Sequence, residues 1–286
     1  MSWVISRKKG GLTGSLLAAL IGMTPIASTM AQQKAATPDF SSKLTGWVGL
    51  NGGGPYFEAD PGRQPGPVVS DPDHPFVPNG VGLQPTFRIA DLTNPNLMPW
   101  AKELMKKDID EILAGKKSAF TAQSSCVPGG VPMFMSYGGG NPIVFLQMPK
   151  VVVLYFTGDQ QIRHVYMDVP HSANPKPSWY GESVGHYEGD TLVIDTIGLS
   201  DKTTADIYRT PHTDRMHVVE RWRIVEGGSM MESVFTVDDP GTFYRPWTAM
   251  RRYRRVQQEP IEQICAENNT SNIFDYHVPT AEKPDF

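Results

Sequence analysis

Residues 217–239 read "HVVERWRIVEGGSMMESVFTVDD". Two runs rich in Val, Ile and aromatic residues flank Gly227-Gly228, a pair typical of the tight turn of a β-hairpin. Side chains alternate between the two faces of a strand, so Glu220 shares the apolar face of Trp222 and is predicted to point into the core. The stretch therefore predicts two antiparallel strands that carry a buried carboxylate.

Further β-strand signals precede and follow this hairpin. They are "IVFLQMPKVVVLYF" at 143–156, "QIRHVYMD" at 161–168, "DTLVIDTIG" at 190–198 and "WTAMRRYRRVQ" at 247–257. Sequential strands at this spacing favour an antiparallel meander. We expect a mainly β fold whose strands form a closed or nearly closed, lipocalin-like barrel, with a β-sandwich as the second interpretation.

The first 98 residues carry few signals of regular structure. Residues 1–31 have a basic start, a short apolar run and small residues at the end, which is the pattern of a signal peptide. Residues 32–98 are rich in Gly, Pro and Asp and are predicted to wrap the core irregularly, apart from a short strand around 47–50. We expect an exported protein, periplasmic or extracellular, whose mature chain has no integral membrane segment.

One amphipathic helix is predicted over residues 99–114. Pro99 suits the first turn of this helix, and Gly115 suits the position just after its end. The apolar stripe of the helix is predicted to be Trp100, Leu104, Ile109, Ile112 and Leu113. Helix and strands are expected to form one β domain over 99–268, followed by an extended tail at 269–286.

Two cysteines, Cys126 and Cys265, are the only ones in the chain. Both lie in the part that is expected to be exported, and paired cysteines are the common outcome in an oxidising compartment. We expect a disulfide between them.

The charge balance is mildly acidic. The net charge is −4, and removal of the three basic residues of the signal peptide would make it more negative. This balance argues against nucleic acid as a partner. The oligomeric state is left open.

Residues 181–185, "GESVG", fit the G-x-S-x-G pattern of a serine hydrolase nucleophile elbow. Such an elbow joins a strand to a helix in a parallel α/β sheet, and neither flank of this stretch has that pattern. We therefore interpret 181–185 as a turn with glycines at positive φ, and we do not expect Ser183 to be a nucleophile.

Acid–base chemistry fits the polar residues that follow. Histidine beside a carboxylate can transfer protons near neutral pH. The predicted catalytic residues are His171, His186 and His212, with Asp168 and Glu188 to orient the imidazoles.

A second set of residues is predicted to contact a small organic ligand: Arg163, Trp179, Tyr180, Glu220 and Trp247. Arg163 is a candidate partner for Glu220, because a buried carboxylate must be paired or have a raised pKa. Structural ion pairs between strands are the competing interpretation of these charges. No compact metal-binding or phosphate-binding motif is present, so no metal and no cofactor are predicted.

Several segments resemble a widespread family of exported bacterial proteins of unassigned function. They are "SWYGESVGHYEGDTLVIDTIGLSDKT", "TPHTDRMHVVERWR", "VDDPGTFYRPWT" and "ICAENN", in this order. The resemblance implies one exported domain and brings no assigned activity. In relatives the position of His164 is often aromatic, which implies that His164 is not a site residue.

The sequence leaves three functional hypotheses. The first is an enzyme that uses a His/carboxylate site for elimination, isomerisation or hydrolysis of a small organic molecule. The second is a non-catalytic β-barrel that binds a small ligand. The third is a structural or interaction protein.

Overall fold

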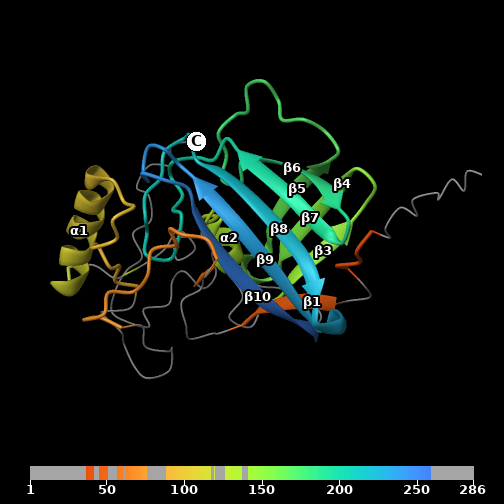
Figure 1. The fold of residues 1–286 in the computed structure, drawn as a ribbon, viewed down its shortest axis with the longest axis horizontal. Helices are drawn as coiled ribbons and strands as arrows, with labels where there is room; N and C mark the ends of the chain where they lie inside the picture. The colour runs from red at the N-terminus through yellow and green to blue at the C-terminus, as the bar shows by residue number, and fades with distance from the viewer. Residues whose placement is uncertain are drawn as a thin grey trace, which may run out of the picture. The chain divides into compact units, whose positions relative to one another are not determined.

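A computed structural model describes residues 37–41, 45–50, 57–60, 62–75, 88–116, 119, 126–136 and 141–258. Within these ranges the protein is mainly β, with a closed barrel of nine strands (Figure 1). The strands are β1 (Thr45–Gly49), β2 (Glu58–Ala59), β3 (Ile143–Gln147), β4 (Val151–Phe156), β5 (Gln161–Met167), β6 (Glu182–Glu188), β7 (Thr191–Ile197), β8 (His217–Val225), β9 (Met230–Asp238) and β10 (Trp247–Gln257).

Strands that follow one another in sequence from β3 to β10 are neighbours in the barrel wall. β1 closes the barrel by pairing antiparallel with both β10 and β3, and Trp47 takes part in both pairings. Short β2 pairs with β10 outside this cycle. The predicted barrel is confirmed, and so is the predicted hairpin of β8 and β9, in which Glu220 lies opposite Phe235.

One pairing departs from the antiparallel meander. β5 and β6 run parallel, with Val165 opposite Ser183 and Met167 opposite Gly185. A parallel pair needs a crossover connection rather than a tight turn. Residues 168–181 form this crossover, which brings the chain back so that β6 begins beside the middle of β5.

β6 corrects the interpretation of residues 181–185 as a turn. Only Gly181 has positive φ, +63°, and it precedes the strand. Gly185 lies within β6 and faces the interior, where an added Cβ would lie 2.8 Å from Cγ1 of Val165. A glycine in a strand often marks such a close approach, and here it weakened the β signal in the sequence.

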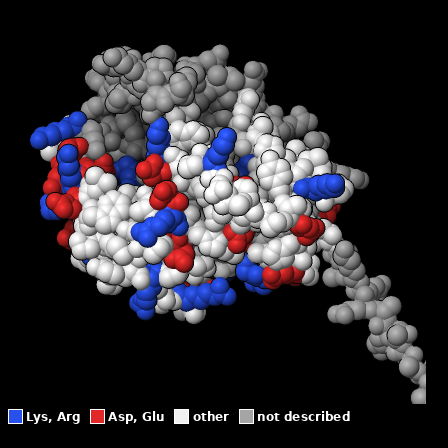
Figure 2. Space-filling model, turned by 90° about the horizontal axis from the view of Figure 1, so that it is seen from above, with Lys and Arg blue, Asp and Glu red and all other residues white. Residues whose placement is uncertain are grey.

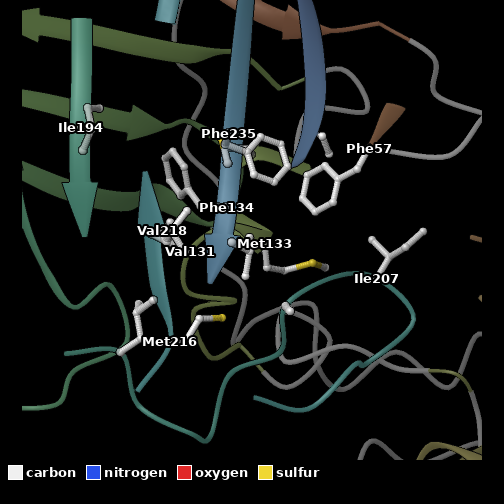
Figure 3. Packing of buried hydrophobic residues seen from close by; sticks show 14 of the residues in the cluster. Phe57, Val131, Met133, Phe134, Ile194, Ile207, Met216, Val218 and Phe235 are labelled. Atoms are coloured by element: carbon white, nitrogen blue, oxygen red, sulfur yellow. The ribbon is translucent and has the colours of Figure 1, made fainter. Parts of the chain in front are cut away.

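Buried side chains fill the barrel. The short helix α2 (Met133–Ser136) is buried along its whole length, and Figure 3 shows its Phe134 near Phe235 of β9. The hydroxyl of Tyr253 on β10 donates to the carbonyl oxygen of Met135 at 2.9 Å. In the interior, the ring centroid of Trp222 lies 5.5 Å from those of both Phe145 and Tyr253.

The segment 32–98 contributes to the core as well as covering it. β1, at the short strand predicted around 47–50, is part of the barrel wall. Several of the described side chains of this segment are buried: Phe40, Trp47, Phe57, Ile89 and Leu97. Because these large apolar residues are scattered among Gly and Pro, they form no periodic pattern in the sequence.

Helix α1 (Pro99–Leu113) confirms the predicted helix but not all of its predicted stripe. The buried side consists of Ala101, Met105, Ile109 and Ile112. Trp100, Leu104 and Leu113, which were also assigned to the stripe, are exposed. The indole N–H of Trp100 instead donates to the carbonyl oxygen of Gly241 at 2.6 Å. Two faces of α1 carry apolar residues, and spacing alone did not identify the buried one.

Some predictions fall outside the described residues. They are the signal peptide at 1–31, the tail at 269–286 and the disulfide, because Cys265 lies beyond residue 258. Neither of the helices that the structure describes combines the length and the apolar character needed to cross a membrane.

Candidate functional site

A chain of hydrogen-bonded His and carboxylate side chains lies on the outer wall of the barrel. We call it the outer cluster, and its members are Glu182 of β6, His171 of the β5–β6 crossover, Asp195 of β7 and His217 of β8. The Nδ1 atom of His171 lies 3.0 Å from Oε1 of Glu182, and its Nε2 lies 2.9 Å from Oδ1 of Asp195. The same Oδ1 lies 2.7 Å from Nε2 of His217. One carboxylate oxygen is thus shared by two imidazoles.

Strand alternation explains why these side chains meet outside the barrel. Thr196 of β7 points inward and is fully buried, so its neighbour Asp195 points outward. Asp195 lies opposite Val219 in the β7–β8 pairing, next to the start of β8, where His217 lies. The antiparallel pairing of β6 with β7 places Glu182 at the same end of the wall.

The crossover brings His171 to this end of the wall. Ser172, the next residue, holds Glu182 with two hydrogen bonds. Its backbone N–H donates to Oε1 at 2.7 Å and its hydroxyl donates to Oε2 at 2.6 Å. The carboxylate of Glu182 therefore ties the crossover to the first residue of β6.

Hydrogen bonds shift the pKa values of three members of the outer cluster. The bonds from Ser172 are the main reason why the pKa of Glu182 is lowered. Burial alone would raise the pKa of Asp195, but the bonds to His217 and His171 lower it overall. The bond to Asp195 raises the pKa of His217 above its ordinary value of 6.5, against the opposing effect of burial.

The two imidazoles differ in what they can do chemically. Both ring nitrogens of His171 face carboxylates, and only the doubly protonated ring can donate to both. His217 uses Nε2 alone, and its Nδ1 makes no hydrogen bond within the part of the chain that the structure describes. The side chain of His217 is 40% exposed. Nδ1 of His217 is therefore the imidazole nitrogen of the outer cluster that no described contact occupies.

His186 and Glu188, two of the predicted catalytic residues, lie further along the same outer wall. Nε2 of His186 is 2.9 Å from Oε1 of Glu188, and Arg221 of β8 donates to Oε2 at 2.6 Å. The bond from Arg221 is the main reason why the pKa of Glu188 is lowered. All three side chains are exposed, and such ion pairs contribute little to stability. Acidic and basic side chains are similarly interspersed over the face in Figure 2.

His212 and Asp168 lie apart from the outer cluster. His212 is buried, and its Nδ1 donates to the carbonyl oxygen of Thr213 at 2.9 Å, while its Nε2 lies 2.6 Å from the hydroxyl of Thr203. Burial lowers the pKa of His212, which fits a neutral, structural ring. Asp168 follows β5 with φ +57°, and among the described contacts its carboxylate bonds to no histidine.

Arg163 and Glu220, predicted to bind a ligand, bind each other inside the barrel. Nη2 of Arg163 lies 2.6 Å from Oε1 of Glu220 and Nη1 lies 3.1 Å from Oε2. Arg163 also donates to the hydroxyls of Ser183 and Thr196, and Trp222 donates to Glu220 at 2.9 Å. The hydroxyl of Ser183 is thus engaged in a buried network, as expected of a residue that is not a nucleophile.

The predicted aromatic walls also lie apart from the outer cluster. Trp247 is buried in a cluster of rings, with its centroid 5.9 Å from that of Phe235. Tyr180 is partly buried, with its hydroxyl bonded to the side chain of Gln161 and its ring 5.7 Å from that of Phe134. Trp179 beside it is partly buried as well.

Sequence reasoning assigned one of the four cluster residues, His171, and missed the other three. Glu182, Asp195 and His217 were given no role. Alternation along β7 and β8 does place Asp195 and His217 on the outer face. The missing information was that residues 182–188 form a strand and that residues 168–181 cross back to the start of this strand.

No three His, Cys, Asp or Glu side chains among the described residues are arranged to hold a metal ion. In the outer cluster each described contact joins a ring nitrogen to a carboxylate oxygen, which is an arrangement for sharing protons.

The fold and the cluster define a class of protein: a closed β-barrel with a partly exposed His/carboxylate network on its outer wall. Scans of the chain against protein-family models, curated proteins and solved structures found no match. Any function must therefore be argued from the cluster itself.

The contribution of the outer cluster to stability is expected to be highest between about pH 4.5 and 6.5. The lowered pKa values of Glu182 and Asp195 add stability at pH values above the unfolded pKa values of 4.5 and 3.8. This added stability is lost as the pH falls through the folded pKa values. The raised pKa of His217 adds stability below its unfolded value of 6.5, and it is lost as the pH rises through the folded value.

This pH dependence is checked by denaturant unfolding of the wild type and of Asp195→Asn from about pH 3 to about pH 9. Each loss is expected to be at most about 1 kcal/mol, because these side chains are partly exposed. The free energy of unfolding of Asp195→Asn is expected to vary less with pH at both the acidic and the alkaline end of this range. Equal pH profiles for the two proteins would contradict the assignment of the pKa shifts to Asp195.

Proposed function

We propose that the protein is an enzyme that transfers a proton to or from a small organic molecule at the outer cluster. The observation that carries the proposal is the sharing of Oδ1 of Asp195 by the Nε2 atoms of His171 and His217. A carboxylate that holds one nitrogen of an imidazole and leaves the other accessible is the usual arrangement of an acid–base histidine. Elimination, isomerisation and hydrolysis all need such a group.

Within this proposal His217 is the catalytic residue. Its raised pKa makes the protonated ring a donor near neutral pH, and the neutral ring accepts a proton at Nδ1. Asp195 is a positioning residue, because it fixes the ring through Nε2. His171 in turn holds Asp195 from the other side, and Glu182 holds His171. Export of the enzyme remains an expectation from the N-terminal sequence.

The two other hypotheses have weaker support. A ligand inside the barrel would have to replace packed side chains such as Phe145, Trp222 and Tyr253, each of which is fully buried. A purely structural role would make the outer cluster a set of contacts between strands. This role predicts no turnover and no binding at Nδ1 of His217, so the same experiments separate it from catalysis.

The proposal is tested by assaying the purified protein for three reactions. They are hydrolysis of aryl esters, dehydration of hydroxy acids, and exchange of solvent deuterium into carbonyl compounds. In the reaction that responds, His217→Gln is expected to lower the rate by about 10²–10⁴-fold, the range for loss of a general acid or base. His186→Gln is the matched control, because His186 is an exposed, carboxylate-paired histidine on the same wall.

The proposal fails if the wild-type rate equals that of His217→Gln. NMR titration of the ring protons gives an independent readout. The pKa of His217 is expected to lie above 6.5 in the wild type and to fall in Asp195→Asn, because the bond to Asp195 is the main cause of the increase. A titration that does not change in this variant would show that Asp195 does not position the ring.

A further inference from the structure

The outer wall of β3, β4 and β5 presents a continuous apolar surface, which we call the β3–β5 face. Alternation and register place its side chains in cross-strand rows. The rows are Val144, Tyr155 and Ile162; Leu146, Val153 and His164; and Val151 with Tyr166. Apart from His164, every member is aliphatic or aromatic, and no Lys, Arg, Asp or Glu interrupts the rows.

Much of this face is in contact with solvent. Half-exposed side chains on it and at its ends are Leu146, Met148, Ile162, Tyr166 and Val169, each between 47% and 52% exposed. Single exposed apolar residues are ordinary on a protein surface, whereas the largest contiguous group of them is often functional. Together these side chains leave on the order of 400 Å² of apolar surface in water, the size of patch that is often functional.

We propose that the β3–β5 face is the interface of a homodimer, in which two copies of the chain pack these faces against each other. A standard interface buries about 800 Å² on each partner. The apolar rows supply roughly half of that area, and the residues around them can supply the rest as a polar rim. A dimer with twofold symmetry uses the same surface patch of both copies, and two β3–β5 faces meet this requirement.

The chemistry of the face favours a second copy over other occupants. Its rows offer no cationic group to an anionic polymer or an anionic membrane, since the exposed Lys150 lies in the β3–β4 turn at the end of the rows, and the chain as a whole has a net charge of −4. Its pleated rows match another pleated wall, because sheet faces pack at about 10 Å with interlocking side chains. This inference is independent of the proposed function, since it uses none of the residues of the outer cluster.

The inference is tested by sedimentation equilibrium of the wild-type protein at about 1–100 µM, the range that resolves dimers of ordinary affinity. We expect a dimer. Leu146→Glu/Ile162→Glu is expected to raise the dimer Kd by at least about 100-fold, because it places charges in the centre of a buried interface. The control is Leu104→Glu/Leu113→Glu, which alters two similarly exposed leucines on α1 and is expected to remain dimeric.

Thermal unfolding of each variant shows whether it is folded. If Leu146→Glu/Ile162→Glu does not fold, the smaller change Leu146→Ser/Ile162→Ser replaces it. The same loss of dimer is expected for this second variant. A wild-type monomer at 100 µM overturns the proposal, and so does a folded face variant that still dimerises. A monomer that binds vesicles of uncharged lipid through these residues would assign the face to a membrane surface and would also overturn it.

Discussion

Glu220→Gln is expected to lower the free energy of unfolding by about 3–5 kcal/mol, the usual cost of leaving one partner of a buried ion pair uncompensated. Both Arg163 and Glu220 have side chains at 0% exposure. The substitution keeps the shape of the side chain and its place beside Trp222 but removes the charge that faces the guanidinium. Arg163 would then retain only neutral partners such as Ser183 and Thr196. Denaturant unfolding monitored by tryptophan fluorescence measures the loss.

Two further variants make this prediction specific. Glu226→Gln makes the same chemical change at an exposed position after β8 and is expected to change stability by less than about 0.5 kcal/mol. The double variant Arg163→Met/Glu220→Leu is expected to recover part of the loss, because apolar residues of similar size often replace a buried ion pair well but the indole N–H of Trp222 loses its acceptor. A loss below about 1 kcal/mol in Glu220→Gln would mean that water reaches Arg163 in the folded protein.

The buried pair and the outer cluster share the same strands. Ser183, which accepts from Arg163, is the neighbour of Glu182 in β6, and Thr196 is the neighbour of Asp195 in β7. The inner hydroxyls and the outer carboxylates therefore point to opposite sides of the same backbone segments. The inner network fixes the positions of β6 and β7, and that placement sets the distances in the outer cluster.

Regular alternation made much of the barrel predictable. In β8 the face of Val218, Glu220 and Trp222 is buried as the period of two predicts. The same alternation correctly placed Glu220 in the interior and left Arg163 as a candidate partner. Local signals also identified α1, because Pro99 and Gly115 mark its ends.

The candidate site was less predictable, because it depends on contacts between distant segments. No local signal shows that β5 and β6 pair in parallel, and only this pairing brings His171 beside Glu182. Spacing to the nearest carboxylate therefore favoured Asp168, which bonds to no histidine among the described contacts, and Glu188, which pairs with the exposed His186 rather than with His171. His212 was selected over His217 although it is buried in a loop, because burial in irregular segments leaves no periodic pattern.

Gly181→Ala is expected to lower the free energy of unfolding by about 2–5 kcal/mol, which combines the cost of positive φ with that of overpacking. Gly181 has φ +63° at the entrance to β6. A Cβ there would lie 2.4 Å from the carbonyl oxygen of Ile197 in β7, a backbone atom that cannot move aside without shifting the strand. The shift would act on Glu182, the next residue and a member of the outer cluster. Denaturant unfolding and the titration of His217 measure both effects.

Gly189→Ala separates the two causes, because Gly189 has nearly the same φ, +62°, and an added Cβ would meet nothing within 4 Å. This control is expected to lose only about 1–2 kcal/mol, the cost of placing a side chain in the left-handed region. The difference between the two variants then measures the steric contact with β7 alone. Equal losses would mean that β6 can move away from β7 at its entrance without cost. In that case Gly181 would matter only for the turn, and the position of Glu182 would depend on Ser172 and His171 instead.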